Sequence, residues 1–268
     1  MMTTFLYSLA GGMMVILATG RVEQIAWKFL RLIGTIVLTL AAGTTAWQLR
    51  ETGDGAWEAH GVVLPLAILL GLSGIVVVFL APFSARWPRL FRLACVCGGS
   101  AGLAAACVLA GGGLNAAGGG VVGMLLGATS QTLGGLVVGS LTVAWLLGHA
   151  YLTATEMTIA PLRHFSRMLS WAVGARILFM LVSLALAWML GGGEGGAILS
   201  RLLNQWIVVS LRVGLGLIAL GLFAYMVSDC VRRRATQSAT GILYFGSIFA
   251  YVGELASQYL VTECGWPV

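Results

Sequence analysis

The sequence VVLPLAILLGLSGIVVVFLAPFSARWPRLFR, residues 62–92, shows the pattern that decides the fold. Residues 62–82 carry no charged side chain, and a run of this length matches the roughly 20 residues that an α-helix needs to cross a hydrocarbon core of about 30 Å. Arg86, Arg89 and Arg92 follow directly. An apolar run followed by a basic connection is typical of a transmembrane helix that ends at the cytoplasmic face of a membrane.

The same alternation recurs along the whole chain. Hydrophobic residues make up 59% of the 268 residues and charged residues only 9%, whereas a soluble domain carries about 25% charged residues. The apolar runs are continuous, unlike the alternating segments of about ten residues in a membrane β-barrel. We therefore predict an all-α polytopic membrane bundle that forms one domain over residues 1–268. The eight predicted spans are 4–20, 29–48, 62–82, 93–111, 132–153, 168–190, 204–228 and 240–262.

The basic residues predict the orientation of these spans. The even-numbered connections contain only Arg50 and Arg201, while eleven of the fifteen Lys and Arg residues lie in the odd-numbered connections. Those eleven are Arg21, Lys28, Arg31, Arg86, Arg89, Arg92, Arg163, Arg167, Arg232, Arg233 and Arg234. By the positive-inside rule both termini face outward, into the periplasm if the membrane is a bacterial inner membrane. The net charge of +6 is then a topology signal, so membrane lipids are expected partners and nucleic acid is not.

Two ionisable residues lie deep in the last two predicted spans. Such side chains cost roughly 2.5–3.5 kcal/mol each on insertion scales, so they usually face a partner or a cavity. Arg212 and Glu254 each lie about eight residues from the outer end of their span, and at about 1.5 Å per residue their depths match. We therefore predict an Arg212–Glu254 ion pair, with Gln258 one turn further out on the face of Glu254. This pair either joins two helices or forms a proton or ligand site.

A third ionisable residue, Arg176, is expected to behave differently. Arg176 lies just inside the predicted span 168–190, near the basic connection that precedes it. A long arginine side chain in such a position extends to the interface or holds an anionic lipid headgroup. We expect Arg176 to extend to the cytoplasmic interface.

The glycine-rich segment 111–131 is the longest stretch outside the predicted spans. It is interpreted as an outer connector, or as a loop with a half-inserted turn. Gly98 with Gly102, and Gly135 with Gly139, have the small-xxx-small spacing of residues that let membrane helices approach closely. These two pairs predict helix-packing faces.

The segment from Trp145 to His164 contains the densest group of reactive side chains. His149 and His164 are predicted near the cytoplasmic interface on neighbouring spans, with Tyr151 and Glu156 between them in the sequence. Two imidazoles at one depth could ligate a b-type haem from opposite faces. The same residues could line a quinone pocket, where a histidine donates to a carbonyl while Tyr151 and Glu156 relay the proton. Ordinary interfacial polar residues are the third interpretation.

Three functions follow from these observations. The first is a membrane subunit of an electron-transfer complex that handles quinone or haem near His149 and is docked to partner subunits. In helix number and outward termini the chain resembles the eight-helix quinol-handling anchors of molybdenum oxidoreductases, such as the polysulfide and dimethyl-sulfoxide reductase families; no residue role is transferred on this architectural likeness. The second is a structural subunit without its own site, and the third a small-solute transporter or channel that uses Arg212 and Glu254. The sequence contains no metal-ligand cluster, nucleophile elbow or phosphate-binding loop, so a catalytic role is expected only within a complex.

Overall fold

The computed structural model describes residues 1–52, 61–116, 120–153, 158–189 and 194–268. Every secondary-structure element within these ranges is a helix, and eight helical spans there are long and apolar enough to cross a membrane. The prediction of an all-α polytopic membrane protein with eight transmembrane helices is therefore confirmed.

Six of the spans are uninterrupted α-helices. They are α1 (Met2–Thr19), α2 (Trp27–Thr52), α5 (Pro88–Ala116), α6 (Gly120–Thr153), α7 (Ala160–Met189) and α11 (Thr236–Cys264). The third span is α4 (Val63–Leu80), which continues into the 3-10 turn η3 (Ala81–Phe83). The seventh span consists of α9 (Trp206–Val213), the π-helical segment η4 (Gly214–Ala219) and α10 (Leu220–Arg232). Two short helices lie in connections, η1 (Val22–Gln24) and α8 (Glu194–Asn204).

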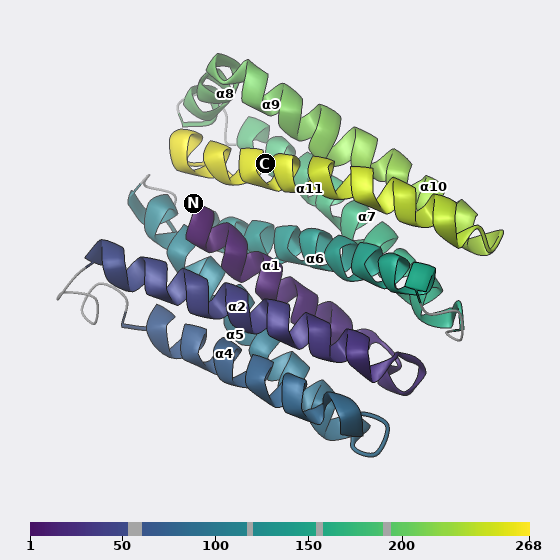
Figure 1. Ribbon diagram of the computed structural model, residues 1–268. Coiled ribbons are helices and arrows are strands. Elements are labelled where there is room, and N and C mark those ends of the chain that lie inside the picture. The colour runs from purple at the N-terminus through teal and green to yellow at the C-terminus, as the bar shows by residue number, and fades with distance from the viewer. Residues whose placement is uncertain (53–60, 117–119, 154–157, 190–193) are drawn as a thin grey trace.

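Helix α1 lies in the middle of the bundle and packs on α5 and α6 (Figure 1). Glycines make both contacts close: a Cβ added at Gly11 would lie 2.7 Å from the backbone nitrogen of Leu103, and one added at Gly12 would lie 1.8 Å from the carbonyl oxygen of Gly135. Gly139 also faces the backbone of Gly12. The predicted face with Gly135 and Gly139 is thus the surface on which α1 crosses α6. Helices α2 and α4 flank one side of this core, and α7, α10 and α11 flank the other.

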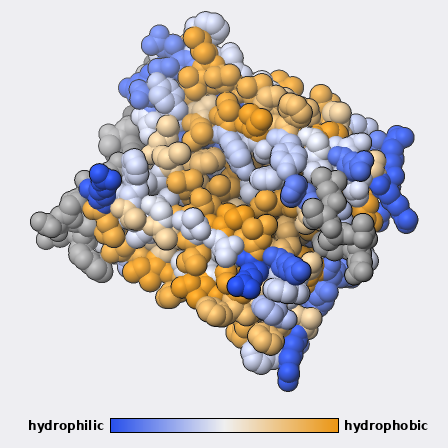
Figure 2. All heavy atoms as spheres, viewed as in Figure 1, coloured by the Kyte–Doolittle hydropathy of each residue, from blue (hydrophilic) through white to orange (hydrophobic). Residues whose placement is uncertain are grey.

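The two ends of the bundle differ in charge. The connections between α1 and α2, between η3 and α5, between α6 and α7, and between α10 and α11 lie at one end, which carries the eleven clustered Lys and Arg residues (Figure 1). We call this the basic end. The opposite end, where α1 begins and α11 ends, is called the terminus end. On the face of the bundle that Figure 2 shows, apolar residues cover much of the middle and hydrophilic residues lie toward the ends. A bundle surrounded by lipid requires this distribution.

The glycine-rich segment 111–131 is helical over most of its length, so its prediction as a loop is wrong. Helix α5 continues to Ala116, and α6 begins at Gly120. Inside a bilayer the backbone groups must be hydrogen-bonded within the chain, and glycine and alanine are then compatible with a helix that packs closely on its neighbours. The earlier start of α6 brings Ser130 and Gln131 into the bundle.

Candidate functional site

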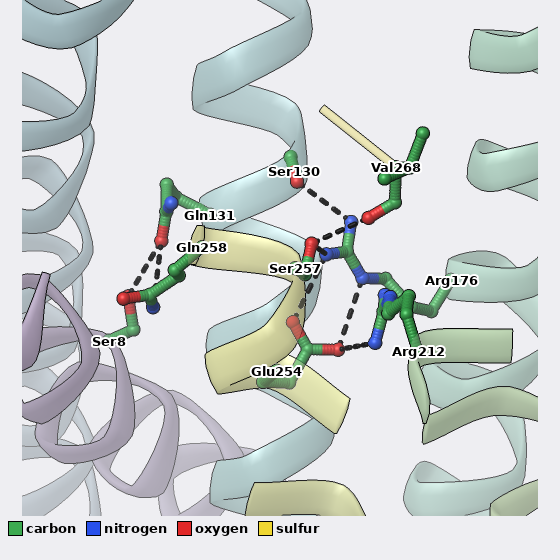
Figure 3. Close-up of polar contacts among 9 residues, drawn as sticks. All are labelled: Ser8, Ser130, Gln131, Arg176, Arg212, Glu254, Ser257, Gln258 and Val268. Carbon is green, nitrogen blue, oxygen red and sulfur yellow. Dashed lines mark hydrogen bonds and ion pairs between the residues drawn. The ribbon is translucent and has the colours of Figure 1, made fainter. Parts of the chain in front are cut away.

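Three charged side chains from three helices meet inside the bundle (Figure 3). Glu254 of α11 lies between Arg176 of α7 and Arg212 of α9. Arg176 donates from Nε to Oε1 at 3.2 Å and from Nη2 to Oε2 at 3.0 Å, a two-pronged contact that matches the planar guanidinium to the carboxylate. Arg212 donates from Nη1 to Oε1 of the same carboxylate at 2.9 Å. The predicted contact between Arg212 and Glu254 is therefore present, as part of a three-residue group that we call the ion cluster.

Small residues of α6 and α11 complete the surroundings of the ion cluster. Arg176 donates from Nη1 to Ser130 Oγ at 2.9 Å and from Nη2 to Ser257 Oγ at 2.8 Å. Gly134 lies one turn along α6 from Ser130, and a Cβ added there would come within 2.5 Å of Glu254 Oε2. The carboxylate therefore occupies space that only a glycine leaves open.

The ion cluster carries an excess positive charge in a buried place. The exposed fractions of Arg212, Arg176 and Glu254 are 0%, 1% and 4%. Two guanidinium groups face one carboxylate, so the charge of the cluster is one positive unit. Arg212 Nε and Nη2 have no hydrogen-bond partner among the described residues. Because burying an unpaired charge is costly, an uncompensated arginine inside a membrane bundle is a candidate binding group.

The prediction that Arg176 extends to the basic interface is wrong. Helix α7 begins at Ala160 rather than near residue 168, so Arg176 lies sixteen residues into the helix, about 24 Å from its start at 1.5 Å per residue. From this depth the Arg176 side chain is too short to reach the basic end. Arg176 instead turns toward α11 and forms two of the three hydrogen bonds that hold Glu254.

Gln258 belongs to a second polar group beside the ion cluster. Its Nε2 donates to Gln131 Oε1 at 3.4 Å, and Ser8 Oγ of α1 donates to the same oxygen at 3.3 Å. Ser257 and Gln258 are adjacent on α11, as Ser130 and Gln131 are on α6, and each serine contacts the ion cluster while each glutamine faces α1 (Figure 3). Gln258 thus lies on the expected helix but makes no recorded contact with either arginine.

The span that carries Arg212 is irregular. The chain breaks its helical path at Gln205, between α8 and α9, and the π-helical segment η4 begins two residues after Arg212. A Cβ added at Gly216 in η4 would lie 2.7 Å from the Cα of Gly253, the residue before Glu254. π-helical segments are frequent at functional sites because they re-aim side chains within a helix. Here the irregular segment directly adjoins the ion cluster.

Two cavities lie along the contact between α7 and the seventh span, one toward each end of the bundle. The basic cavity has a volume of about 590 Å³ and lies between residues 163–170 of α7 and 225–232 of α10. Its charged and hydroxyl residues are Arg163, Ser166, Arg167, Ser170, Tyr225, Ser228, Asp229 and Arg232. The apolar cavity has a volume of about 220 Å³ and includes Arg212 in its wall. Arg176 lies on α7 between the residues that line the two cavities.

The histidine group at the basic end is only partly assembled. His149 Nδ1 and Tyr244 Oη of α11 are 3.2 Å apart, and the Tyr244 ring also packs on Trp145. Tyr151 donates from Oη to the carbonyl oxygen of Thr158. Glu156 lies outside the described residues.

The second histidine has different neighbours. His164 Nε2 lies 3.0 Å from Thr19 Oγ1 of α1, while His149 contacts α11. Their contacts point to two helices and do not join the imidazoles in one site. A common haem or quinone pocket between His149 and His164 therefore stays a prediction.

The uncharged residues around the ion cluster were not predicted from the sequence. Ser130, Gly134 and Ser257 carry no charge, and serine and glycine are common in membrane helices for packing alone. Their signal is positional, because the pair Ser130-Gln131 on one span matches Ser257-Gln258 on another, and the serine of each pair contacts Arg176. Comparison of the chain with protein-family models, curated proteins and solved structures finds no match.

Proposed function

We propose that this protein is a membrane transport protein for a small anionic solute, and that the solute moves along the contact between α7 and the seventh span. One observation carries the proposal. A buried cluster with excess positive charge lies between two cavities that open along the same pair of helices, one toward each end of the bundle. Transporters typically bind their solute near the middle of the membrane, with access from each side in turn.

The charges of the path suit an anion. Arg163, Arg167 and Arg232 line the basic cavity against a single acid, Asp229, which is already paired with Arg232 at 2.8 Å. An anion that enters there meets a positive potential, and the excess charge of the ion cluster continues it inward. Glu254 limits this attraction, because it neutralises one of the two buried arginines. A site of moderate strength can release its solute, as transport requires.

The irregular seventh span supplies a place for movement. In η4 the backbone departs from α-helical hydrogen bonding, and Gly216 and Gly253 let η4 and α11 pack with almost no side-chain material between them. Discontinuous helices at the membrane centre are common at the binding sites of secondary transporters. A rotation of α9 about η4 would move Arg212 relative to Glu254 and to the apolar cavity.

The test is flux into vesicles. The full chain is reconstituted into liposomes, and uptake of labelled chloride, phosphate and acetate is measured. We expect uptake of at least one of these anions above that of protein-free vesicles, loss of this uptake in Arg212→Gln, and retention in Arg201→Gln, which changes an exposed arginine of α8 outside both cavities. Uptake equal to protein-free vesicles for all three anions, with monodisperse protein, would refute the proposal.

A second candidate is the electron-transfer subunit, favoured by the group of Trp145, His149 and Tyr244. An imidazole next to a tyrosine hydroxyl near the basic end is suited to donate to a quinone carbonyl and to pass on its proton. This function requires partner subunits and an energy-conserving membrane such as the bacterial inner membrane. Purification in mild detergent tests it: redox partners with a bound quinone or a haem spectrum, altered by His149→Ala, would support it. A colourless, quinone-free protein that purifies alone would count against it.

A further inference from the structure

The apolar cavity combines an almost wholly apolar wall with one buried arginine. It lies between α7, α8 and α9, and its lining consists almost entirely of hydrocarbon. The apolar residues are Met180, Leu184, Leu199, Leu202, Leu203, Trp206, Val209, Val213 and Val268. The other two lining residues are Ser210 and Arg212, so Arg212 is the one charged residue among the described residues that line the cavity.

The edge of Arg212 that lacks a partner is suited to bind a carboxylate. Arg176 holds Glu254 through Nε and Nη2, which project side by side from one edge of the guanidinium. On Arg212 the same two nitrogens, Nε and Nη2, have no hydrogen-bond partner among the described residues, because Glu254 contacts Nη1. The chain thus shows, a few ångströms away, how this edge binds a carboxylate. On Arg212 the equivalent edge is buried and has no hydrogen-bond partner among the described residues.

Charge also favours a monoanion. One added carboxylate would balance the ion cluster, with two guanidinium groups facing two carboxylates. A phosphate dianion would bring more charge than the cluster can balance and would need further donors, and Ser210 has the one hydroxyl among the described lining residues. Both free nitrogens are themselves buried, so the headgroup must displace neighbouring wall atoms to reach them.

The volume of the cavity limits the rest of the ligand. About 220 Å³ is smaller than the roughly 300–1,000 Å³ of a site for a drug-sized molecule. It suits one short alkyl chain or one ring and is too small for a two-chain lipid. Leu203 and Trp206 line the cavity and are also 67% and 64% exposed, so a ligand can enter from the surrounding apolar phase at this point.

We propose that the apolar cavity binds a short amphiphilic monocarboxylate, with its carboxylate on Nε and Nη2 of Arg212 and its hydrocarbon against α7, α8 and α9. This inference deepens the proposed function, on which it rests for the passage of the ligand across the membrane, by naming the class of solute. Binding itself can be measured without transport.

Trp206 reports on occupancy because it lines the cavity. The full chain in lipid nanodiscs is titrated with octanoate that carries bromine on its terminal carbon, a contact quencher of indole fluorescence, and the signal of the Trp206→Phe variant is subtracted. We expect saturable quenching that octanoate reverses. Octylammonium, with the same chain and the opposite charge, is expected to compete at least tenfold less well, because its headgroup would face a buried cation. Equal competition by octylammonium would overturn the proposal.

Two variants separate the headgroup contact from the chain contact. Arg212→Gln should weaken bromo-octanoate binding at least tenfold, since it removes the charge and the two-pronged edge. Val209→Phe narrows the cavity and leaves the ion cluster intact, so it tests the site even if Arg212→Gln does not fold. We expect Val209→Phe to weaken binding about tenfold, because overpacking a filled site costs about 1–3 kcal/mol. Ile207→Phe places the same ring on a neighbouring exposed residue outside the cavity and should bind as the natural chain does.

The outcomes keep the two proposals apart. Equal quenching in Val209→Phe and Ile207→Phe would mean that the probe only dissolves in lipid around Trp206, and the cavity would not be a carboxylate site. Saturable, Arg212-dependent binding, with uptake of octanoate, chloride, phosphate and acetate all equal to that of protein-free vesicles, would support the site and refute transport. Uptake of chloride, phosphate or acetate without octanoate binding would support transport and refute this class of solute.

Discussion

Arg176 holds the Glu254 carboxylate along one edge, with Nε to Oε1 at 3.2 Å and Nη2 to Oε2 at 3.0 Å. Arg212 adds a third hydrogen bond to Oε1 at 2.9 Å, so a single acid balances charge on two helices at once. The cluster joins α7, α9 and α11. The three residues are therefore unequal: Glu254 is shared, while each arginine has the acid as its only charged partner in the cluster.

This inequality predicts the order of stability losses. Glu254→Gln leaves two buried guanidinium groups without a counter-charge and should lower the free energy of unfolding by about 3–5 kcal/mol, the usual cost of breaking a buried pair. Arg212→Leu leaves the neutral Arg176–Glu254 pair intact and should cost less. Reversible unfolding in mixed micelles measures both changes. Glu263→Gln, an exposed acid on the same helix, is the control and should cost almost nothing. A larger loss for Arg212→Leu than for Glu254→Gln would contradict the shared role of the acid.

The size of residue 134 is predicted to be critical. A Cβ at this position would lie 2.5 Å from Glu254 Oε2, well inside the normal contact distance, and would push the carboxylate away from Arg176. Gly134→Ala should therefore destabilise the protein by about 1–3 kcal/mol, the usual cost of overpacking. Gly123→Ala makes the same change on the same helix in open space and should be neutral or slightly stabilising, since alanine is the better helix former. Equal thermal stability of the two variants in detergent would argue against the close contact.

The sequence was sufficient for the spans and for one ion pair, and the reason is physical. A lipid environment disfavours charged residues along the full length of a transmembrane helix, so each span shows as a largely uncharged run in the sequence. Arg212 and Glu254 are conspicuous because they interrupt such runs. Helix ends are less visible, because apolar helices can extend past the hydrocarbon into polar surroundings. The early start of α7 at Ala160 moved Arg176 from the expected interface to the ion cluster.

Contacts through uncharged atoms could not be predicted. Whether Ser130 faces a charge or a neighbouring backbone depends on the rotation of α6, which the sequence does not determine. The π-helical segment Gly214–Ala219 consists of glycine, leucine, isoleucine and alanine, all compatible with an ordinary apolar helix. The two cavities lie between α7 and the parts of the seventh span on either side of this segment, so they depend on helix packing that the sequence does not determine.

The crossing of α1 and α6 depends on glycine. A Cβ at Gly12 would lie 1.8 Å from the carbonyl oxygen of Gly135, a distance at which the two backbones have to separate. Because Gly12 is at the centre of the bundle, Gly12→Ala should lower the thermal unfolding temperature strongly or prevent folding. Gly43→Ala on α2 has open space around its new Cβ and serves as the control. A folded Gly12→Ala variant with the stability of Gly43→Ala would contradict this close crossing of α1 and α6.

The distribution of arginines predicts which end of the bundle faces the cytoplasm. The basic end carries Arg233 and the terminus end carries Glu263, both exposed. In a variant whose five cysteines are replaced by alanine, Arg233→Cys should resist a membrane-impermeant maleimide applied to intact spheroplasts, while Glu263→Cys should react. Lysis of the spheroplasts is the control and should make both cysteines reactive. The reverse pattern in intact spheroplasts would place the basic end outside, and an anion that enters through the basic cavity would then come from the external side.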